Sequence, residues 1–145
     1  MARRGTLFDV NALVALCLTT HLHHRAAHRF LATLHNPWYT TPITEAALYR
    51  LLLNPAITGS PRMFAEVDSV VQGLRTHPTW NLLADDSTLT QASVTTAVLT
   101  GHQQVTDLHL VNLSAKHLLT LATFDRGMLQ WLAPADHQHV QIIPT

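Results

Sequence analysis

The sequence predicts an α/β fold in which a central, mostly parallel sheet is covered by helices on both faces. Short apolar runs typical of buried strands alternate with longer segments that carry apolar residues at helical spacing. The 145 residues contain no long linker and no internal repeat, which favours one domain over residues 1–145. In sheets of this kind, the chemistry lies outside the carboxyl ends of the strands.

The first half of the chain is expected to supply two strands and three helices. The predicted elements are a strand over 6–9, helices over 12–18 and 23–34, a strand over 38–40, and a helix that begins at 41 and ends at 53. Thr41 offers a capping hydroxyl to the last of these helices, and Pro42 suits its first turn.

The second half is expected to complete the sheet. The predicted elements are a helix that begins at Ser60-Pro61 and stops near His77-Pro78, with its apolar face over 64–74, a strand over 80–84, helices over 88–99 and 105–117, a strand over 118–124, and an edge strand over 140–143. The signals are Ser60-Pro61 at the start of the first helix, Gly101 after the second, and Pro144 after the last strand.

Composition narrows the range of functions. Nine basic and nine acidic residues give a net charge of zero, which argues against a broad basic surface for nucleic acid. The single cysteine, Cys17, has no partner in the chain, and this favours a reducing, cytoplasmic setting. Since no window approaches the roughly 18 apolar residues of a membrane helix, a membrane protein is not expected.

Four of the nine acidic residues lie where a predicted strand ends or a predicted helix begins. They are Asp9, Glu45, Asp107 and Asp125. Carboxylates are the hard oxygen ligands that Mg²⁺ and Mn²⁺ use in proteins. Taken singly, each could be an ordinary strand-end or first-turn acid, which the helix dipole favours. Taken together, they predict a metal site built by the fold.

Two other polar groups are interpreted as structural. Asp85 and Asp86 follow a predicted strand and suit a turn and helix start before Ser87, so they are left outside the site. A second group comprises His21, His23, His24 and His28. These histidines could bind a metal, but no fixed set of acceptors accompanies them, and a packing or solvated role is favoured.

Five segments, in order and spacing, resemble the PIN-domain ribonucleases, and within them the VapC-type toxins of bacterial toxin–antitoxin pairs, especially the actinobacterial branch. The segments are Leu7-Phe8-Asp9-Val10-Asn11-Ala12-Leu13, His21-Leu22-His23-His24, Thr41-Pro42-Ile43-Thr44-Glu45, Val105-Thr106-Asp107-Leu108-His109-Leu110 and Leu121-Ala122-Thr123-Phe124-Asp125-Arg126. The resemblance covers nearly the whole chain. Leu108 departs from it, since alanine is usual after the third acid.

The resemblance implies roles for particular residues. Asp9 and Asp107 would be the main ligands of Mg²⁺, or of Mn²⁺, and Glu45 and Asp125 would complete the acidic cluster. Thr123 would support Asp125 or a metal-bound water, and Asn11 would orient a carboxylate. From its position beside Asp125, Arg126 is the first candidate among the arginines for a phosphate contact.

The implied activity is that of a metal-dependent endoribonuclease, a toxin that cleaves cellular RNA. The implied partners are a VapB-type antitoxin, a second copy in a homodimer, and DNA only through the antitoxin. One alternative is a non-catalytic metal-binding or regulatory module that acts through the antitoxin complex, although retention of all four acids argues against it. A DNA-flap or RNA-processing nuclease is disfavoured because such proteins carry additional domains or insertions.

Overall fold

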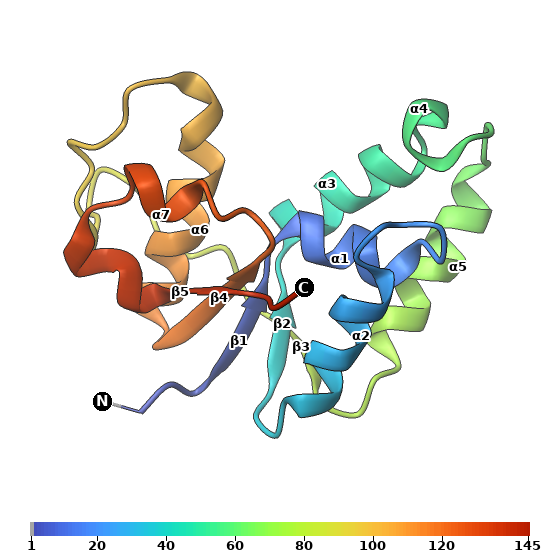
Figure 1. Ribbon diagram of the computed structural model, residues 1–145, viewed down its shortest axis with the longest axis horizontal. Coiled ribbons are helices and arrows are strands. Elements are labelled where there is room, and N and C mark those ends of the chain that lie inside the picture. Colours follow the sequence, from blue (N-terminus) through green and yellow to red (C-terminus); the bar gives the residue numbers. More distant parts are fainter. Residues whose placement is uncertain (1) are drawn as a thin grey trace.

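The computed structural model describes residues 2–145 and contains a five-stranded sheet whose strands are all parallel (Figure 1). The strand order is β3-β2-β1-β4-β5. The strands are β1 (Gly5–Phe8), β2 (Trp38–Thr40), β3 (Trp80–Leu82), β4 (Leu119–Thr123) and β5 (Val140–Ile142). The predicted α/β class, with a parallel sheet between helices, is therefore confirmed.

Helices connect the strands and cover both faces of the sheet (Figure 1). The α-helices are α1 (Val10–Cys17), α2 (His24–Thr33), α3 (Pro42–Leu52), α4 (Pro55–Thr58), α5 (Phe64–Arg75), α6 (Val105–Lys116) and α7 (Met128–Trp131). Two 3-10 helices, η1 (His102–Gln104) and η2 (Pro134–His139), complete the described elements. None of these helices combines the length and the apolar character needed to cross a membrane.

The central strand β1 is buried on both faces, which explains why it carries no charged residue. Successive side chains of a strand point to opposite faces, so Phe8 joins the core beneath α1, α2, α3 and α5, and Leu7 joins the core beneath α6 and α7. The ring of Phe8 contacts that of Trp38 edge to face, with centroids 5.3 Å apart. This packing fixes β1 at the centre and brings its carboxyl end beside that of β4.

The start of α3 has the predicted capping chemistry. Thr41 Oγ1 accepts a hydrogen bond from Thr44 N at 3.0 Å, and Thr44 Oγ1 accepts one from Thr41 N at 2.9 Å. Pro42 is the first helical residue. The two reciprocal bonds fix where α3 leaves the sheet edge, and thereby fix the position of Glu45 in its first turn.

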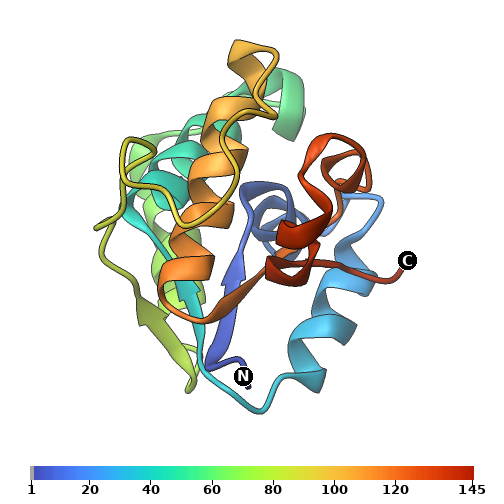
Figure 2. The same ribbon diagram turned by 90° about the vertical axis from the view of Figure 1, so that its left-hand side faces the viewer.

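The helix predicted over residues 88–99 is wrong, because this part of the chain has only turns and bends. Asn112 on α6 holds it in place: its Oδ1 accepts a hydrogen bond from Ser93 N at 2.8 Å, and its Nδ2 donates one to Thr88 O at 3.2 Å. Asp136 Oδ2 accepts another from Thr95 N at 2.8 Å. Figure 2 shows this segment, in yellow, running beside α6. Side chains of α6 and η2 therefore satisfy amide groups that a helix would have paired internally.

Replacing Gly5 by alanine is expected to destabilise the fold by about 1–3 kcal/mol, measured by denaturant unfolding. A Cβ at Gly5 would lie 2.3 Å from the backbone oxygen of Pro37, which already accepts a hydrogen bond from Thr6 N. Relief of this clash requires β1 and β2 to separate. Gly73→Ala on α5 is the matched control: a Cβ there has nothing within 4 Å, so a neutral or stabilising effect is expected. An equal loss in both variants would contradict the steric explanation.

Candidate active site

The acidic residues identified in the sequence lie at the carboxyl edge of the sheet or in the first turn of a helix. Asp9 directly follows β1 and caps α1, and its Oδ1 accepts a hydrogen bond from Val10 N at 2.7 Å. Asp125 follows β4, the parallel neighbour of β1. Glu45 lies in the first turn of α3, and Asp107 lies in the first turn of α6.

The carboxylate of Asp9 is held by a short chain of polar side chains. Asn11 Nδ2 donates to Thr123 Oγ1 at 2.9 Å, and Thr123 Oγ1 donates to Asp9 Oδ2 at 2.8 Å. Thr123 Oγ1 also accepts a hydrogen bond from Asp125 N at 3.1 Å. Thr123 therefore contacts the side chain of Asp9 and the backbone of Asp125, and Asn11 reaches Asp9 through Thr123. These bonds fix the orientation of Asp9 and join the ends of β1 and β4.

Asp9, Asp107 and Asp125 influence one another electrostatically. Burial is the main cause that raises the pKa of Asp9; hydrogen bonds from Thr123 and Val10 oppose it, and the charge of Asp125 adds to it. Burial, followed by repulsion from Asp9 and Asp125, raises the pKa of Asp107 to about 6. Within residues 2–145, no basic side chain forms an ion pair with any of the three. The sheet edge thus carries negative charge without a protein cation to balance it.

Glu45 is held differently from the three aspartates. Arg75 Nη2 donates to Glu45 Oε1 at 2.6 Å, and Thr40 Oγ1 donates to Glu45 Oε2 at 2.5 Å. Glu45 is not among the charges that raise the pKa of Asp9 or Asp107. Glu45 therefore differs from the three aspartates in having an arginine as its ion-pair partner. Sequence reasoning missed Arg75, because its only local signal is a basic residue in the last turn of α5, 30 positions from its partner.

No three carboxylate, imidazole or thiolate groups within residues 2–145 are arranged as a metal-binding centre. The three aspartates nevertheless fit Mg²⁺ or Mn²⁺ in donor type and charge. All three supply hard oxygen atoms. Burial, and after it the negative charges of Asp9 and Asp125, raise the pKa of Asp107, and a divalent cation would offset both effects by favouring the ionised carboxylate. Asp125 is exposed and Asp107 half-buried, so both are accessible to water and to a substrate.

Arg126 is exposed and follows Asp125 directly, at the same edge of the sheet. Within residues 2–145 it forms no ion pair, so its guanidinium is available to a phosphate group. In the turn that follows, Gly127 N donates to Asp125 Oδ1 at 2.9 Å. This turn fixes the backbone from which Arg126 projects.

Asp85 and Asp86 lie outside this site, although not for the expected reason, since no helix begins at Ser87. Both instead pair with histidines, one on α6 and one directly after it. His109 Nε2 lies 2.5 Å from Asp85 Oδ1, and His117 Nε2 lies 2.6 Å from Asp86 Oδ1. These contacts attach the irregular segment to α6. The two aspartates are anchors of the fold.

The histidines near the start of α2 pack against α1. The ring of His24 donates to Ala15 O at 2.8 Å, and that of His28 donates to Leu16 O at 3.0 Å. The two rings contact each other with centroids 4.5 Å apart. These bonds satisfy carbonyl groups in the last turn of α1. The packing role favoured from the sequence therefore holds for His24 and His28.

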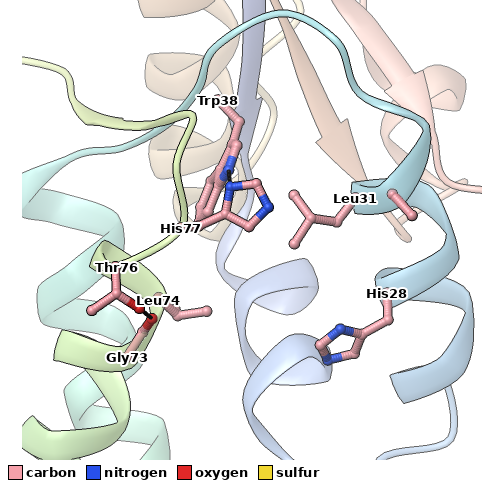
Figure 3. A pocket seen from close by; sticks show the side chains of 8 residues that line it. His28, Leu31, Trp38, Gly73, Leu74, Thr76 and His77 are labelled. Carbon is pink, nitrogen blue, oxygen red and sulfur yellow. Dashed lines mark hydrogen bonds between the residues drawn. The ribbon is translucent and has the colours of Figure 1, made fainter.

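A pocket of about 380 Å³ lies between α2 and α5, away from the aspartates (Figure 3). Its lining is mainly apolar and includes Trp38, whose indole Nε1 donates to His77 Nδ1 at 3.0 Å. Trp38 begins β2, so the pocket lies toward the amino ends of the strands. It is therefore opposite the carboxyl edge that carries Asp9 and Asp125, called the acidic edge below. No carboxylate lines it. The pocket therefore takes no part in the candidate active site.

A parallel sheet with acidic residues at its carboxyl edge is consistent with a PIN domain. No family model matches the chain. Among curated proteins, it is 39% identical over 123 residues to Ribonuclease VapC38 of Mycobacterium tuberculosis, covering 84% of this chain and 86% of that protein. From the same organism, Ribonuclease VapC39 is 35% identical over 127 residues, and Ribonuclease VapC29 is 34% identical over 122. In both cases the aligned region covers 84% of this chain; it covers 89% of VapC39 and 86% of VapC29. The chain belongs to the VapC family of PIN-domain ribonuclease toxins.

Proposed function

We propose that this protein is a metal-dependent endoribonuclease that hydrolyses phosphodiester bonds in cellular RNA and so arrests growth. The substrate class is tRNA, rRNA or mRNA. The observation that carries the proposal is the set of three aspartates at the sheet edge, whose charges act on one another and which have no ion-pair partner among residues 2–145. Membership of the VapC family supports the same conclusion.

Asp9 and Asp107 would hold Mg²⁺ or Mn²⁺, with Asp125 beside them and Glu45 at the neighbouring strand end. The ion would neutralise charge on the phosphate and activate the attacking water. Asn11 and Thr123 keep the Asp9 carboxylate in one orientation through two hydrogen bonds, so little reorganisation is needed on binding. Arg126, exposed beside Asp125, would contact a phosphate of the RNA.

We further propose a VapB-type antitoxin as partner and a homodimer as the assembled form. Exposed apolar side chains at the α4–α5 corner support a protein-binding surface. Met63 is 72% and Phe64 61% exposed, and the ring of Phe64 stacks on that of Tyr49 with centroids 5.3 Å apart. Apolar side chains clustered in this way are typical of interaction surfaces. Contact with DNA would be made through the antitoxin.

Purified protein is expected to cleave RNA in Mg²⁺ or Mn²⁺ and to lose this activity in EDTA. The physical reason is that the acidic edge repels phosphate unless a cation binds between them. The measurement is gel analysis of a pool of total cellular RNA, because the particular substrate is unknown. Readdition of Mg²⁺ in excess of EDTA should restore cleavage.

Two results would count against the proposal. Cleavage that is unchanged in EDTA would exclude the metal mechanism. A protein that binds Mg²⁺ but leaves every RNA of the pool intact, and does not arrest growth when expressed alone, would favour the alternative of a metal-binding regulatory module. Asp125→Asn serves as the control for contaminating nucleases, since it removes a carboxylate of the site and should remove the activity.

A further inference from the structure

The guanidinium of Arg75 donates hydrogen bonds to both oxygens of the Glu45 carboxylate. Arg75 Nη2 donates to Oε1 at 2.6 Å, and Arg75 Nε donates to Oε2 at 3.2 Å. Bidentate pairing of this kind is stronger and more directional than a single contact. The side chain of Glu45 is only 10% exposed, so solvent does not compete effectively for the carboxylate.

The ion pair is part of a closed ring of contacts. Thr40 Oγ1 donates to Glu45 Oε2 at 2.5 Å, and Trp80 Nε1 donates to Thr40 Oγ1 at 2.9 Å. The ring closes where Arg75 Cζ lies over the Trp80 ring, 4.7 Å from its centroid. The four residues come from β2, α3, α5 and β3. Every group in the ring has a partner that fixes its position.

The two charged partners differ in their access to solvent. The side chain of Arg75 is 39% exposed, against 10% for that of Glu45. The guanidinium can therefore leave the pair and be hydrated, whereas the carboxylate would remain buried at the sheet edge. Departure of Arg75 would add a fourth unpaired carboxylate to an edge that already carries three.

We propose that Arg75 is a positioning residue that holds Glu45 in an internal ion pair and thereby withholds it from the metal. The inference rests on the proposed metal-dependent nuclease. With Arg75 in place, the aspartates hold the cation without Glu45. With Arg75 removed, Glu45 is free to join them, and the cation is held more tightly. Arg75 thus sets how strongly the site binds its metal.

The test is the affinity of the full-length, metal-free protein for Mg²⁺, measured by titration calorimetry. Arg75→Gln is expected to lower the Kd roughly three- to tenfold, since it frees a carboxylate. Arg75→Lys is expected to give an intermediate Kd, because an ammonium group cannot make the bidentate contact. Arg50→Gln, at the exposed last-turn arginine of α3, is the matched control and should leave the Kd unchanged.

A double-mutant cycle separates an effect through Glu45 from a general effect of charge. In a Glu45→Gln background, Arg75→Gln should change the Kd less than about twofold, because no carboxylate is left to be released. An equal change in both backgrounds would mean that the guanidinium acts only through its field and would overturn the inference. So would a Kd for Arg75→Gln and Arg75→Lys equal to that of wild type.

Failure of the inference is distinguishable from failure of the proposed function. If wild type binds Mg²⁺ and cleaves RNA but Arg75→Gln behaves like Arg50→Gln, the role of Arg75 alone is rejected. If wild type binds no Mg²⁺, the proposed function and the inference fall together. Should Arg75→Gln not fold, Arg75→Lys and Glu45→Gln still decide the question, because both keep a hydrogen-bonding group in the ring.

Discussion

Replacing Asp9 or Asp107 by asparagine is expected to lower the rate of RNA cleavage by roughly 10²–10⁴-fold. Asparagine keeps the shape of the side chain but removes the negative charge that would hold Mg²⁺. Loss of several kcal/mol of transition-state stabilisation corresponds to this range at tenfold per 1.36 kcal/mol. The measurement is the single-turnover rate on the RNA pool, together with growth of a host that expresses each variant without an antitoxin.

Asp86→Asn is the control for this experiment. Asp86 pairs with His117, directly after α6, and lies outside the candidate site, so its variant should cleave RNA and arrest growth like wild type. Both assays need matched expression levels. If Asp9→Asn and Asp107→Asn stay as toxic as Asp86→Asn, the active site lies elsewhere in the protein.

The sheet and the acidic edge could be predicted because their signals are local. The strand β1 is buried at every position, and its sequence Gly5-Thr6-Leu7-Phe8 carries no charged residue, which is typical of a strand covered on both faces. Asp9 then marks the end of the strand by capping α1, and Thr41 with Pro42 marks the start of α3. Parallel strands bring their carboxyl ends to one edge, so the position of Asp125 after β4 also follows from the sequence.

The remaining features depend on contacts between distant residues. Nothing near Glu45 indicates Arg75, which reaches it only because α5 returns along α3. The segment over 88–99 does not form the helix predicted for it, because Asn112 and Asp136 supply other partners for its amide groups. The four-residue helices α4 and α7 are too short to produce a periodic signal.

Metal-free Asp107→Asn is expected to be more stable than metal-free wild type at neutral pH, by about 1–2 kcal/mol. Burial and the charges of Asp9 and Asp125 raise the pKa of Asp107 to about 6, from an ordinary 3.8. Folding therefore favours the protonated form of Asp107, and ionisation of this carboxyl lowers the free energy of unfolding. The full shift would correspond to about 3 kcal/mol, but the side chain is partly exposed and solvent screens the interaction.

The stability difference between wild type and Asp107→Asn is expected to depend on pH. Wild type should lose stability relative to Asp107→Asn as the pH rises from about 4 to 6, and the difference should stay constant above that range, because a raised acid pKa penalises folding only once the group ionises. Below pH 4 the two proteins should unfold at similar temperatures. Thermal unfolding in EDTA across this range measures the effect.

Addition of Mg²⁺ should reverse the order at neutral pH. A ligand present at 100 times its Kd stabilises the folded state by about 2.7 kcal/mol, or roughly 5–10 °C for a chain of this size. Asp107→Asn has lost a proposed ligand and should gain much less. The two measurements together distinguish a metal site from structural acids: carboxylates that stabilise the fold by themselves would make Asp107→Asn less stable in EDTA and leave wild type indifferent to Mg²⁺. That pair of results would remove Asp107 from the site. If instead Asp107→Asn is more stable than wild type in EDTA and does not respond to Mg²⁺, the charge of Asp107 destabilises the metal-free fold and is needed to bind the cation.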